Sequence, residues 1–498
     1  MRAPSVAMTA DVEAQLRQHL IRPDGQEDIC LATYAPSTGS RRFSAIINSF
    51  APPKPGDRAV HGNASITGAY IVRVAAEASR AGRGVAILHS HPLGRGWQHM
   101  SKLDSEAERS YAYLVHEVTG HPLVGMTLAG EDGSWSARAW SAGGTTSWCE
   151  SVRTIGEQLK VSWNDELRLP PVANESQIRT VSAWGATAQH SLARLRVLVV
   201  GAGSVGLDVA LRLAATGIQH VAVMDFDRVQ TVNLDRLVGA TRLDAALQRS
   251  KVKVAGRLMA SSATASKPEI VTYDMSVCEP AGLAVALDYD VILSCVDRPW
   301  PRAVLNQIAY TDLIPVIDGG IAIDAFPDGA GMRSATSRTH VVRPGRPCLA
   351  CNKQLDLATV TLDRQGLLDD PLYIADADPS VRPRRQNVAA LSASVSASLL
   401  AQFISLIIAP GGHGEPGPLR FSLSTHFLEH LPYATRATCP VEIAVGAGDS
   451  RAPLAGPHAL AHQPLSPPPS RFGRRLYLFV ARRCEVAAGL FTSLALPR

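Results

Sequence analysis

The sequence of 498 residues has no long block of lysine and arginine, and its 49 basic and 44 acidic residues give a net charge of only +5. So small a charge, scattered over the whole chain, does not indicate nucleic-acid binding. The eight cysteines include a single CxxC pair and otherwise stand alone. This excludes the disulfide framework of a small secreted protein and fits a reducing compartment with a metal site. We therefore expect a cytoplasmic protein.

Residues 1–20 contain no long apolar core and no cleavage pattern, so we expect no signal peptide. The one membrane-like run, at 389–409, contains five serines and a glutamine. It predicts a buried helix rather than a membrane span. With 46% hydrophobic residues, the chain has material for two to four domains at roughly 100–200 residues each.

Changes of pattern divide the chain into four parts. Residues 1–145 alternate β-like runs with a helix over 66–82, which predicts an α+β domain. Residues 146–190 are predicted to be a mostly helical, polar lead-in. In 191–445, strand-like and helical runs alternate, which is typical of α/β domains with a mostly parallel sheet. Residues 446–498 are rich in Pro, Gly, Ser and Ala and predict a disordered tail that ends in a short helix.

The first candidate site is "HSHPLGRGWQHMSKLD", residues 89–104. His89 and His91 end a β-like run, and residues two apart in a strand point to the same side. Both can therefore face one ion together with Asp104, which starts a predicted helix. Two imidazoles and a carboxylate make a zinc set with one position open for water, whose pKa the ion lowers to about 7.

This order resembles the JAB/JAMM (MPN) metalloisopeptidase family, whose motif is H-x-H-P, a spacer and S-x-x-D. Here the two halves are 89–92 and 101–104, with a spacer two residues longer than the commonest form. His99, in the spacer, is an alternative ligand.

The resemblance implies that Ser101 helps to stabilise the oxyanion and that a glutamate before the first core strand is the general base. Glu27 fits that place, and Glu13 and Asp28 are the alternatives. A base at this position would take a proton from water and pass it to the leaving amine.

The second candidate site begins in 196–217, "RVLVVGAGSVGLDVALRLAATG", as a strand, a glycine-rich turn and a helix. Gly201, Gly203 and Gly206 permit a tight turn and let a phosphate approach N–H groups at a helix N-terminus. Asp225, after the next strand-like run, suits a ribose hydroxyl. This much fits a nicotinamide-dependent enzyme equally well.

The residues that follow the glycine turn distinguish a nicotinamide-dependent enzyme from other nucleotide-binding enzymes. They are Asn233, Arg236, Lys251, Asp297, Arg302 and Asn306. The series resembles the ThiF/MoeB and ubiquitin-activating family of adenylating enzymes, whose pattern is D-x-D, N-L-x-R, a lysine and D-x4-R-x3-N. It spans roughly 179–442 and departs at Leu237, where many members have glutamine.

The resemblance implies a Rossmann-like domain in which most of these residues act on ATP, with no role assigned to Asn306. Asp225 would hold the ribose. Asn233, Arg236 and Lys251 would neutralise the triphosphate and the charge that develops as pyrophosphate leaves. Asp297 would hold Mg²⁺ between the phosphates. The remaining ATP-binding residues would be the three glycines and Arg302, and Arg179 matches an arginine that reaches ATP in the family, sometimes from a partner subunit.

Cys348 and Cys351 form the CxxC pair, and Cys439 follows alone in "TCPVE". The family resemblance implies a structural zinc held by four thiolates, but Glu442 stands where the fourth cysteine would be. Three thiolates cannot close a tetrahedral site alone. The site is either completed by Glu442, His430 or water, or it is degenerate and binds no metal.

Residues 352–438 contain no cysteine, although family members that form a thioester carry one in this segment. We therefore expect an acyl-adenylate that is handed to a thiol on another protein. A thioester on this chain would need an unexpected cysteine, such as Cys278, Cys439 or Cys484.

Both resemblances imply chemistry on the same kind of substrate, a small protein with a reactive C-terminus. The resemblances imply a bifunctional enzyme of a bacterial ubiquitin-like system, some of which are linked to phage defence. It would adenylate the C-terminal glycine of a ubiquitin-like protein with ATP, and cleave the precursor or conjugates of that protein with zinc. We expect a separate conjugating or thiol-bearing partner and a homodimer formed through the adenylating domain. The alternatives are an enzyme that activates a sulfur-carrier protein and trims its tail, and a non-catalytic scaffold.

Overall fold

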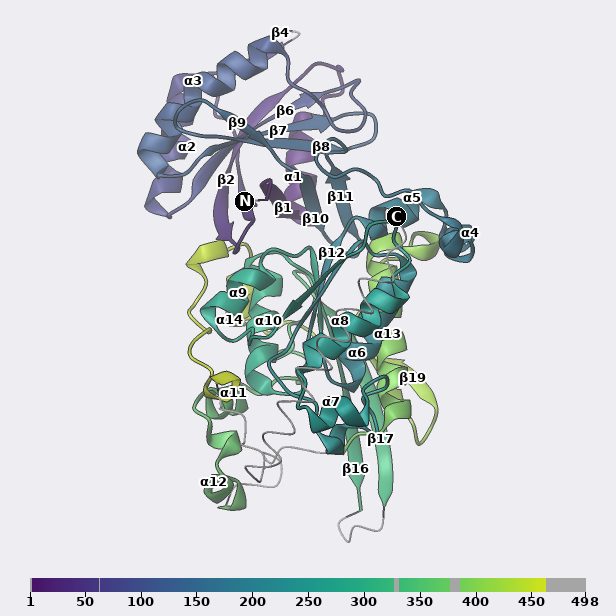
Figure 1. Cartoon of the computed structure of the whole chain (residues 1–498). Helices are drawn as coiled ribbons and strands as arrows, with labels where there is room; N and C mark the ends of the chain where they lie inside the picture. The colour runs from purple at the N-terminus through teal and green to yellow at the C-terminus, as the bar shows by residue number, and fades with distance from the viewer. Residues whose placement is uncertain (1, 62, 327–330, 377–385, 463–498) are drawn as a thin grey trace.

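The computed structural model describes residues 2–61, 63–326, 331–376 and 386–462, which form two sheet-based units stacked end to end (Figure 1). The N-terminal unit has helices α1 (Ala10–Leu20), α2 (Gly68–Arg80) and α3 (Lys102–Thr119). Its strands are β1 (Ser5–Thr9), β2 (Ile29–Thr38), β3 (Phe43–Ala51), β4 (Arg58–His61), β5 (Asn63–Ile66), β6 (Gly84–His91), β7 (Leu123–Ala129), β8 (Trp135–Trp140), β9 (Thr146–Trp148), β10 (Ser151–Ile155) and β11 (Leu159–Trp163).

Nine of these strands form one mixed sheet in the order β11-β10-β1-β3-β2-β6-β7-β8-β9, and β4 and β5 form a separate hairpin. Side chains alternate between the two faces of the sheet. Along β2, for example, Cys30 and Ala32 belong to the core under α1, whereas Leu31 belongs to the core under α2 and α3. The N-terminal unit is therefore an α/β layer structure with helices on both faces of a mixed sheet, and not the α+β domain that the sequence predicts.

The prediction of a helical lead-in over 146–190 is wrong for its first half. Residues 146–163 contain β9, β10 and β11, and β10 pairs in parallel with β1. β-branched residues in "SVRTI" favour the strand, and Val152 and Ile155 are buried in it. The N-terminal sheet thus continues past the predicted boundary at residue 145. The helical part is η1 (Glu175–Gln177), α4 (Ile178–Trp184) and α5 (Ala186–Ala193).

The second unit is Rossmann-like. Its strands are β12 (Arg196–Val200), β13 (His220–Met224), β14 (Glu269–Tyr273), β15 (Val291–Ser294), β16 (Val316–Ala325), β17 (Met332–Val342), β18 (Leu419–Ser422) and β19 (Phe427–His430). They are ordered β14-β13-β12-β15-β16-β17-β18-β19, parallel from β14 to β16 and antiparallel beyond. The predicted α/β architecture with a mostly parallel sheet is confirmed here.

Helices cover both faces of this sheet. They are α6 (Ser204–Thr216), α7 (Arg242–Ala246), α8 (Lys251–Ser262), α9 (Pro280–Ala286), α10 (Pro299–Thr311), α11 (Leu357–Arg364), α12 (Pro371–Asp376), α13 (Ala389–Ile408) and α14 (Pro440–Ile443). Short 3-10 turns are η2 (Thr231–Asn233), η3 (Leu367–Asp369), η4 (Pro410–Gly412), η5 (Gly448–Ser450) and η6 (Ala459–His462). By length and composition α13 is the one described helix that is apolar enough to cross a membrane. It packs against α6, β16 and β17, with Leu399 and Phe403 in the core, as the sequence predicted for this run.

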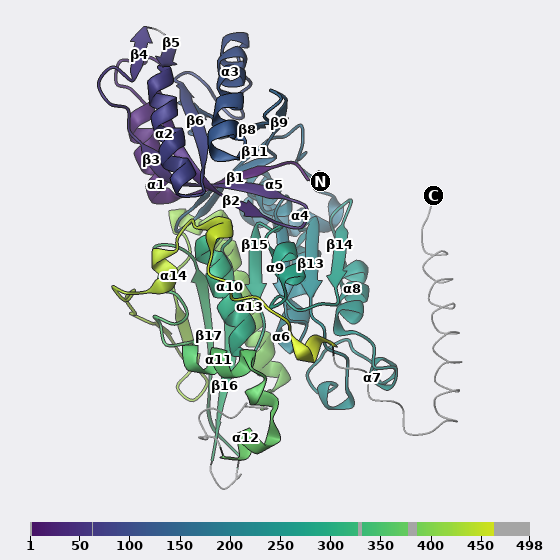
Figure 2. The ribbon, with the colours of Figure 1, turned by 90° about the vertical axis from the view of Figure 1, so that its left-hand side faces the viewer.

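The prediction of a disordered tail is wrong for 446–462. This segment runs along the outside of the Rossmann-like unit, drawn in yellow-green and yellow (Figure 2). Asp449 accepts hydrogen bonds from the backbone N–H and hydroxyl of Thr38, at 3.0 and 2.6 Å. His458 Nδ1 lies 2.7 Å from Ser276 Oγ. These polar anchors order the segment although its composition is typical of disorder. The rest of the predicted tail, with its helix and Cys484, lies outside the described residues.

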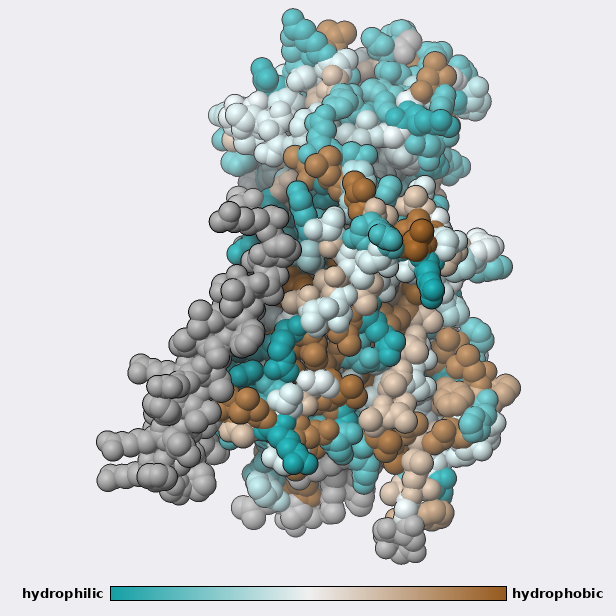
Figure 3. Space-filling model, turned by 45° about the vertical axis from the view of Figure 1, so that its right-hand side comes forward, coloured by the Kyte–Doolittle hydropathy of each residue, from teal (hydrophilic) through white to brown (hydrophobic). Residues whose placement is uncertain are grey.

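Most exposed large apolar side chains of the described residues belong to the Rossmann-like unit and the segments next to it. On the face in Figure 3, brown residues gather over the lower part of the molecule, whereas the N-terminal unit at the top is mostly hydrophilic. The exposed residues of the Rossmann-like unit include Val232, Val238, Leu243, Phe427, Leu428 and Ile443.

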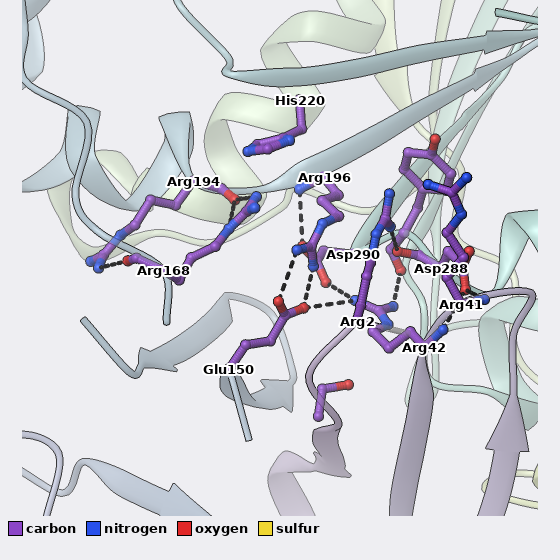
Figure 4. Close-up of polar contacts among 12 residues, drawn as sticks. Arg2, Arg41, Arg42, Glu150, Arg168, Arg194, Arg196, His220, Asp288 and Asp290 are labelled. Atoms are coloured by element: carbon purple, nitrogen blue, oxygen red, sulfur yellow. Dashed lines mark hydrogen bonds and ion pairs between the residues drawn. The ribbon is translucent and has the colours of Figure 1, made fainter. Parts of the chain in front are cut away.

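A buried ionic cluster joins the two units (Figure 4). Arg42, after β2, donates to Asp290 at 2.5 Å, and Glu150, before β10, forms two hydrogen bonds with Arg196 of β12. Burial alone would raise the pKa of Asp290, but Arg42, Arg153 and Arg196 hold it well below its ordinary value. Arg42 with Asp290 and Glu150 with Arg196 are thus ion pairs between the two units, whereas the buried guanidinium of Arg153 forms no hydrogen bond with the described residues.

The junction lies at the amino-terminal edge of the parallel sheet. Arg196 begins β12, His220 begins β13 and Asp290 directly precedes β15. The N-terminal unit therefore covers the edge at which these strands start. The N-terminal unit does not cover the carboxyl edge, where open α/β sheets bind their ligands.

Candidate active sites

The structure brings His89, His91 and Asp104 together. His89 Nε2 lies 3.2 Å from His91 Nε2 and 3.9 Å from Asp104 Oδ2, and one ligand atom from each residue lies within 4.8 Å of the others. The two histidines end β6, and the carboxylate lies in the first turn of α3. Two imidazole nitrogens and one carboxylate oxygen around one point fit a zinc ion with an open fourth position.

The loop between the two halves of the motif fixes Asp104. Ser101 is the N-cap of α3: its Oγ accepts from the Asp104 N–H at 3.1 Å and donates to Asp104 Oδ2 at 2.7 Å. S-x-x-D is thus a capping box here, and an oxyanion role for Ser101 stays a prediction. His99 lies against Trp148 and within 3.9 Å of Glu166, and it is not part of the cluster.

A buried cation lies behind the cluster. Arg138 on β8 donates to Thr127 Oγ1 at 2.7 Å and to Glu108 of α3 at 2.9 Å, and the Thr127 hydroxyl lies 3.4 Å from His89 Nε2. Burial and the charge of Arg138 lower the pKa of His89 to about 3, so this ring is neutral and can bind a metal. The sequence analysis missed Arg138 and Glu108. The only feature of the sequence that points to this pair is the position of Arg138 inside the apolar run "WSARAW".

Glu27 lies two residues before Ile29, the first residue of β2, which pairs with His89, and this register brings the glutamate near the cluster. Burial raises the pKa of Glu27, His91 lowers it and Asp104 raises it. The two alternatives have other partners. Glu13 pairs with Arg17, and Asp28 is buried between the cations of Arg22 and Arg58. Glu27 is thus the candidate whose charge acts on the metal-binding groups, and its role as the base stays a prediction.

The three glycines of the second site differ in what an added side chain would meet. Gly201 has φ +94°, and a Cβ there would lie 2.6 Å from Cys295 O. A Cβ at Gly206 would lie 1.8 Å from Gly201 O, so the helix can approach the strand only without a side chain. Gly203, the N-cap of α6, faces open space. The turn therefore leaves room for a phosphate at the helix N-terminus.

Three carboxylates surround Lys251 at the carboxyl edge of the sheet. Asp225 accepts hydrogen bonds from the backbone N–H of Ala202 and Asp227, at 2.6 and 2.7 Å. Lys251 Nζ lies 2.6 Å from Asp227 Oδ2. Burial lowers the pKa of Lys251, but Asp225, Asp227 and Asp297 raise it above its ordinary value. The structure thus brings three predicted ATP-site residues, Asp225, Lys251 and Asp297, into one electrostatic group.

Other predicted ATP-site residues are held by protein groups. Asn233 Oδ1 accepts from the Gln230 N–H in η2, and Arg236 donates to Val232 O. Arg302 is buried and donates to Asp318 with Nε and Nη2, at 3.1 and 2.5 Å. Contacts of Asn233, Arg236 and Arg302 with ATP therefore stay predictions.

Cys348, Cys351 and Cys439 form a second buried cluster, with the three sulfurs within 4.8 Å of one another. The Arg436 N–H donates to Cys351 Sγ at 3.4 Å. Burial would raise the pKa of Cys439, but backbone N–H groups and neighbouring thiols lower it. N–H groups that donate to sulfur stabilise thiolates, which are the form that binds metal.

Glu442 is the better placed of the two candidate side-chain ligands for the fourth position. It lies on α14, three residues after Cys439, which is the N-cap of that helix. Glu442 Oε2 is enclosed and has no hydrogen-bond partner among the described residues, whereas His430 is exposed on β19. A buried carboxylate oxygen without a partner costs free energy that a bound cation would offset. The Glu442 carboxylate is nevertheless not among the atoms within 4.8 Å of one another that group the three sulfurs. The three thiolates fit a zinc ion, and Glu442 as its fourth ligand stays a prediction.

Residues 175–440 match the ThiF family, and the N-terminal unit matches no family. The "Adenylyltransferase and sulfurtransferase MOCS3" of Aedes aegypti is 28% identical over 170 residues, 34% of this chain and 38% of that protein. The "Adenylyltransferase and sulfurtransferase UBA4" of Meyerozyma guilliermondii is 29% identical over 223 residues, 41% of this chain and 48% of that protein. The chain thus spans less than half the length of these curated relatives. A solved structure of E. coli MccB with ATP aligns over 54% of this chain and 74% of that one, with 16% identity and a TM-score of 0.41.

Proposed function

The chain belongs to the ThiF family, and from this we propose that its Rossmann-like unit uses ATP to adenylate the C-terminal carboxylate of a ubiquitin-like or sulfur-carrier protein. One observation carries the proposal: the glycine turn and the group of Asp225, Lys251 and Asp297 share the carboxyl edge of the sheet, opposite the edge that the N-terminal unit covers. Nucleotide binding at this edge is what the topology of open α/β sheets favours.

In this reaction a carboxylate oxygen of the substrate attacks the α-phosphorus of ATP, and the bond to pyrophosphate breaks. N–H groups at the start of α6 would receive the phosphates. Lys251 would oppose the charge that develops on the leaving group, and Asp225 would accept from the ribose. The exposed carboxylate of Asp297 would hold Mg²⁺, a hard cation that prefers oxygen.

The product would be an acyl-adenylate, whose acyl group a thiol of a separate conjugating or sulfur-bearing protein would accept while AMP leaves. Two cysteines of this chain are poor nucleophiles, because burial raises the pKa of Cys278 and of Cys295. Cys439 belongs to the second metal cluster. These features support transfer to another protein rather than a thioester on the described part of this chain.

For the N-terminal unit we propose a JAB/JAMM-type peptidase that cleaves the precursor or conjugates of the same substrate protein. The cluster of His89, His91 and Asp104 supports this, with Glu27 in electrostatic reach. A zinc ion bound there would act as a Lewis acid and lower the pKa of water. Glu27 would take a proton from the attacking water and give it to the leaving amine. Arg138 would keep His89 neutral and, through Thr127, in place.

The exposed apolar residues of the Rossmann-like unit support a homodimer formed through that unit, which we also propose (Figure 3). A bacterial ubiquitin-like conjugation system would combine both activities on one partner. A sulfur-carrier protein is the second candidate substrate, because the curated relatives are adenylyltransferases that are also sulfurtransferases.

ATP–pyrophosphate exchange tests the adenylation directly. The purified chain should exchange labelled pyrophosphate into ATP only when a ubiquitin-like or sulfur-carrier protein that ends in glycine is present. The same partner with its last glycine removed is the control, because it lacks the reacting carboxylate in the right place. Exchange at the same rate with and without a partner protein, or no exchange with any candidate partner, contradicts the proposed function.

Cobalt substitution tests Glu442 as the fourth ligand of the cysteine cluster. In a His89→Ala/His91→Ala background, which removes the other metal site, Glu442→Ala should weaken metal retention, and Glu442→Cys should restore it. The cysteine variant should also raise the sulfur-to-cobalt absorption, because a fourth thiolate replaces oxygen. His430→Ala is the matched control and should change neither quantity. Loss of metal in the His430 variant with none in Glu442→Ala would assign the position to the histidine.

A further inference from the structure

A polar cavity of about 160 Å³ lies on one face of the β16–β17–β18 region, beside the Cys348–Cys351 loop. Arg338, Lys353 and Arg420 line it, and no aspartate or glutamate is among its lining residues. Nothing in the proposed adenylation chemistry uses this cavity. Its lining favours a ligand group that carries negative charge.

The strand register places two like charges opposite each other in the cavity wall. Arg338 of β17 pairs with Gly320 of β16 on one side and with Arg420 of β18 on the other. Arg420 forms an ion pair with Glu429 at 2.5 Å. The Arg338 side chain forms no hydrogen bond or ion pair with any residue of the described ranges, although the charge of the buried Asp318 acts on it, and its Nε is buried. Like charges directly opposite on neighbouring strands repel, so an anion between them would stabilise this arrangement.

The other wall contains buried amide groups without partners. Asn352 is 1% exposed, and its Nδ2 lies 2.7 Å from His340 Nδ1, which fixes the side chain and leaves Oδ1 without a partner. Both amide atoms of the buried Gln354 also have no hydrogen-bond partner within the described residues. Lys353 between them has φ +60°, a left-handed conformation that is rare for a residue with a side chain. Unpaired buried groups around one cavity indicate a bound polar group, since few native proteins leave such groups unsatisfied.

The cavity is linked to the nucleotide edge through Arg302. The guanidinium donates to Gln354 O at 2.8 Å and to Asp318, which precedes Gly320 by two residues on the same face of β16. Arg302 lies in the first turns of α10, close in sequence to Asp297. An extended chain whose end reaches the nucleotide edge can therefore place an earlier side chain in the cavity.

We propose that this cavity is a specificity subsite that binds an acidic side chain in the C-terminal tail of the protein substrate, upstream of the carboxylate that is activated. The acidic group would lie between Arg338 and Arg420 and accept from the Gln354 amide. The unpaired oxygens of Asn352 and Gln354 would accept backbone N–H groups of the tail. A neutral or basic side chain would leave Arg338 without an ion pair, so the subsite selects against it. This inference rests on the proposed adenylation of a protein C-terminus.

Labelled peptides that end in Gly-Gly provide the probe. One series carries a single glutamate at successive upstream positions, and a matched series carries glutamine there. With the full chain and a non-hydrolysable ATP analogue, fluorescence anisotropy should give about 10-fold tighter binding of glutamate than of glutamine at one position, as expected for a hydrogen bond to a charged group. Arg338→Gln should remove this preference. Arg333→Gln should keep it, because Arg333 lies on the same strand but is exposed and pairs with Asp324.

Three outcomes overturn the inference: equal affinity for both series at every position, a preference that survives Arg338→Gln, and no binding of any peptide by the wild type. Arg420→Gln is the second variant if Arg338→Gln does not fold, as judged by its thermal transition. Inorganic phosphate that binds in an Arg338-dependent way, with no preference between the peptide series, would make the cavity a site for free anions only. Pyrophosphate exchange with a full-length partner but no glutamate preference refutes the subsite alone. A glutamate preference without exchange by any partner refutes the adenylation instead.

Discussion

Replacing Asp297 with alanine should lower partner-dependent ATP–pyrophosphate exchange by about 10²–10³-fold, the usual cost of removing one group that stabilises transition-state charge. The carboxylate is exposed, follows β15 at the carboxyl edge, and makes no hydrogen bond with the described residues. Its charge acts on Lys251. A group so placed contributes little to the fold, so the loss should appear in the exchange rate while the thermal transition stays near that of the wild type.

Asp274→Ala is the matched control for this variant. Asp274 is exposed at the same edge, directly after β14, and pairs with Arg228 at 3.0 Å. Its removal takes away the same charge without touching the Lys251 group, and exchange should fall by less than about 3-fold. Equal losses in both variants would mean that general charge at this edge matters and not Asp297 itself.

The structure also predicts that Asp297→Ala leaves peptide-bond cleavage unchanged, because the two candidate sites face away from each other. β2 begins beside His89 and ends at Thr38, which contacts Asp449 of the Rossmann-like unit. Its ten residues span about 30 Å, so the histidine cluster lies a full strand away from the junction. The glycine turn lies at the opposite end of β12 from the junction residue Arg196. A substrate tail must therefore leave one site before it reaches the other on the same chain.

Local spacing made much of both sites predictable. His89 and His91 share one side of a strand because of its two-residue period, and Ser101 and Asp104 share a helix turn because of the capping box. The glycine turn is predictable in the same way, because Gly201 and Gly206 lie within six residues of each other and a side chain at either position would clash with nearby backbone. Motifs of this kind carry their geometry in the sequence.

Long-range pairing was not predictable from the sequence. Residues 151–155 form a strand because β1, far away in sequence, offers an open edge, and 446–462 are ordered because Thr38 and Ser276 offer polar partners. Arg138 can be recognised as part of the histidine site only after β8 and α3 are in place. The proposed specificity subsite for an acidic side chain depends on the pairing of Arg338 with Arg420 on neighbouring strands, which no local sequence pattern encodes.

Replacing Glu27 with glutamine should lower cleavage of a C-terminally extended ubiquitin-like or sulfur-carrier protein by about 10²–10⁴-fold, the range for loss of a positioned general base. The amide keeps the size of the side chain but cannot take a proton from water. None of the three metal-binding side chains is changed, so zinc content should match the wild type, whereas His91→Ala should lose the ion. Mass spectrometry of the cleaved substrate and metal analysis measure the two quantities separately.

Glu131→Gln provides the control for Glu27, because it removes an exposed carboxylate from the loop after β7, where its partner is Arg95 at 3.6 Å. Cleavage by this variant should be unchanged. Pyrophosphate exchange should stay at the wild-type rate in both glutamine variants, since the ionic junction around Asp290 holds the units together without Glu27. If Glu27→Gln lowered exchange and cleavage together, the two activities would depend on one another through the junction, and the division of labour between the units would have to be abandoned. If it lowered neither, Glu27 would be an ordinary charged residue at the start of a strand, and the base would have to be sought elsewhere around the histidines.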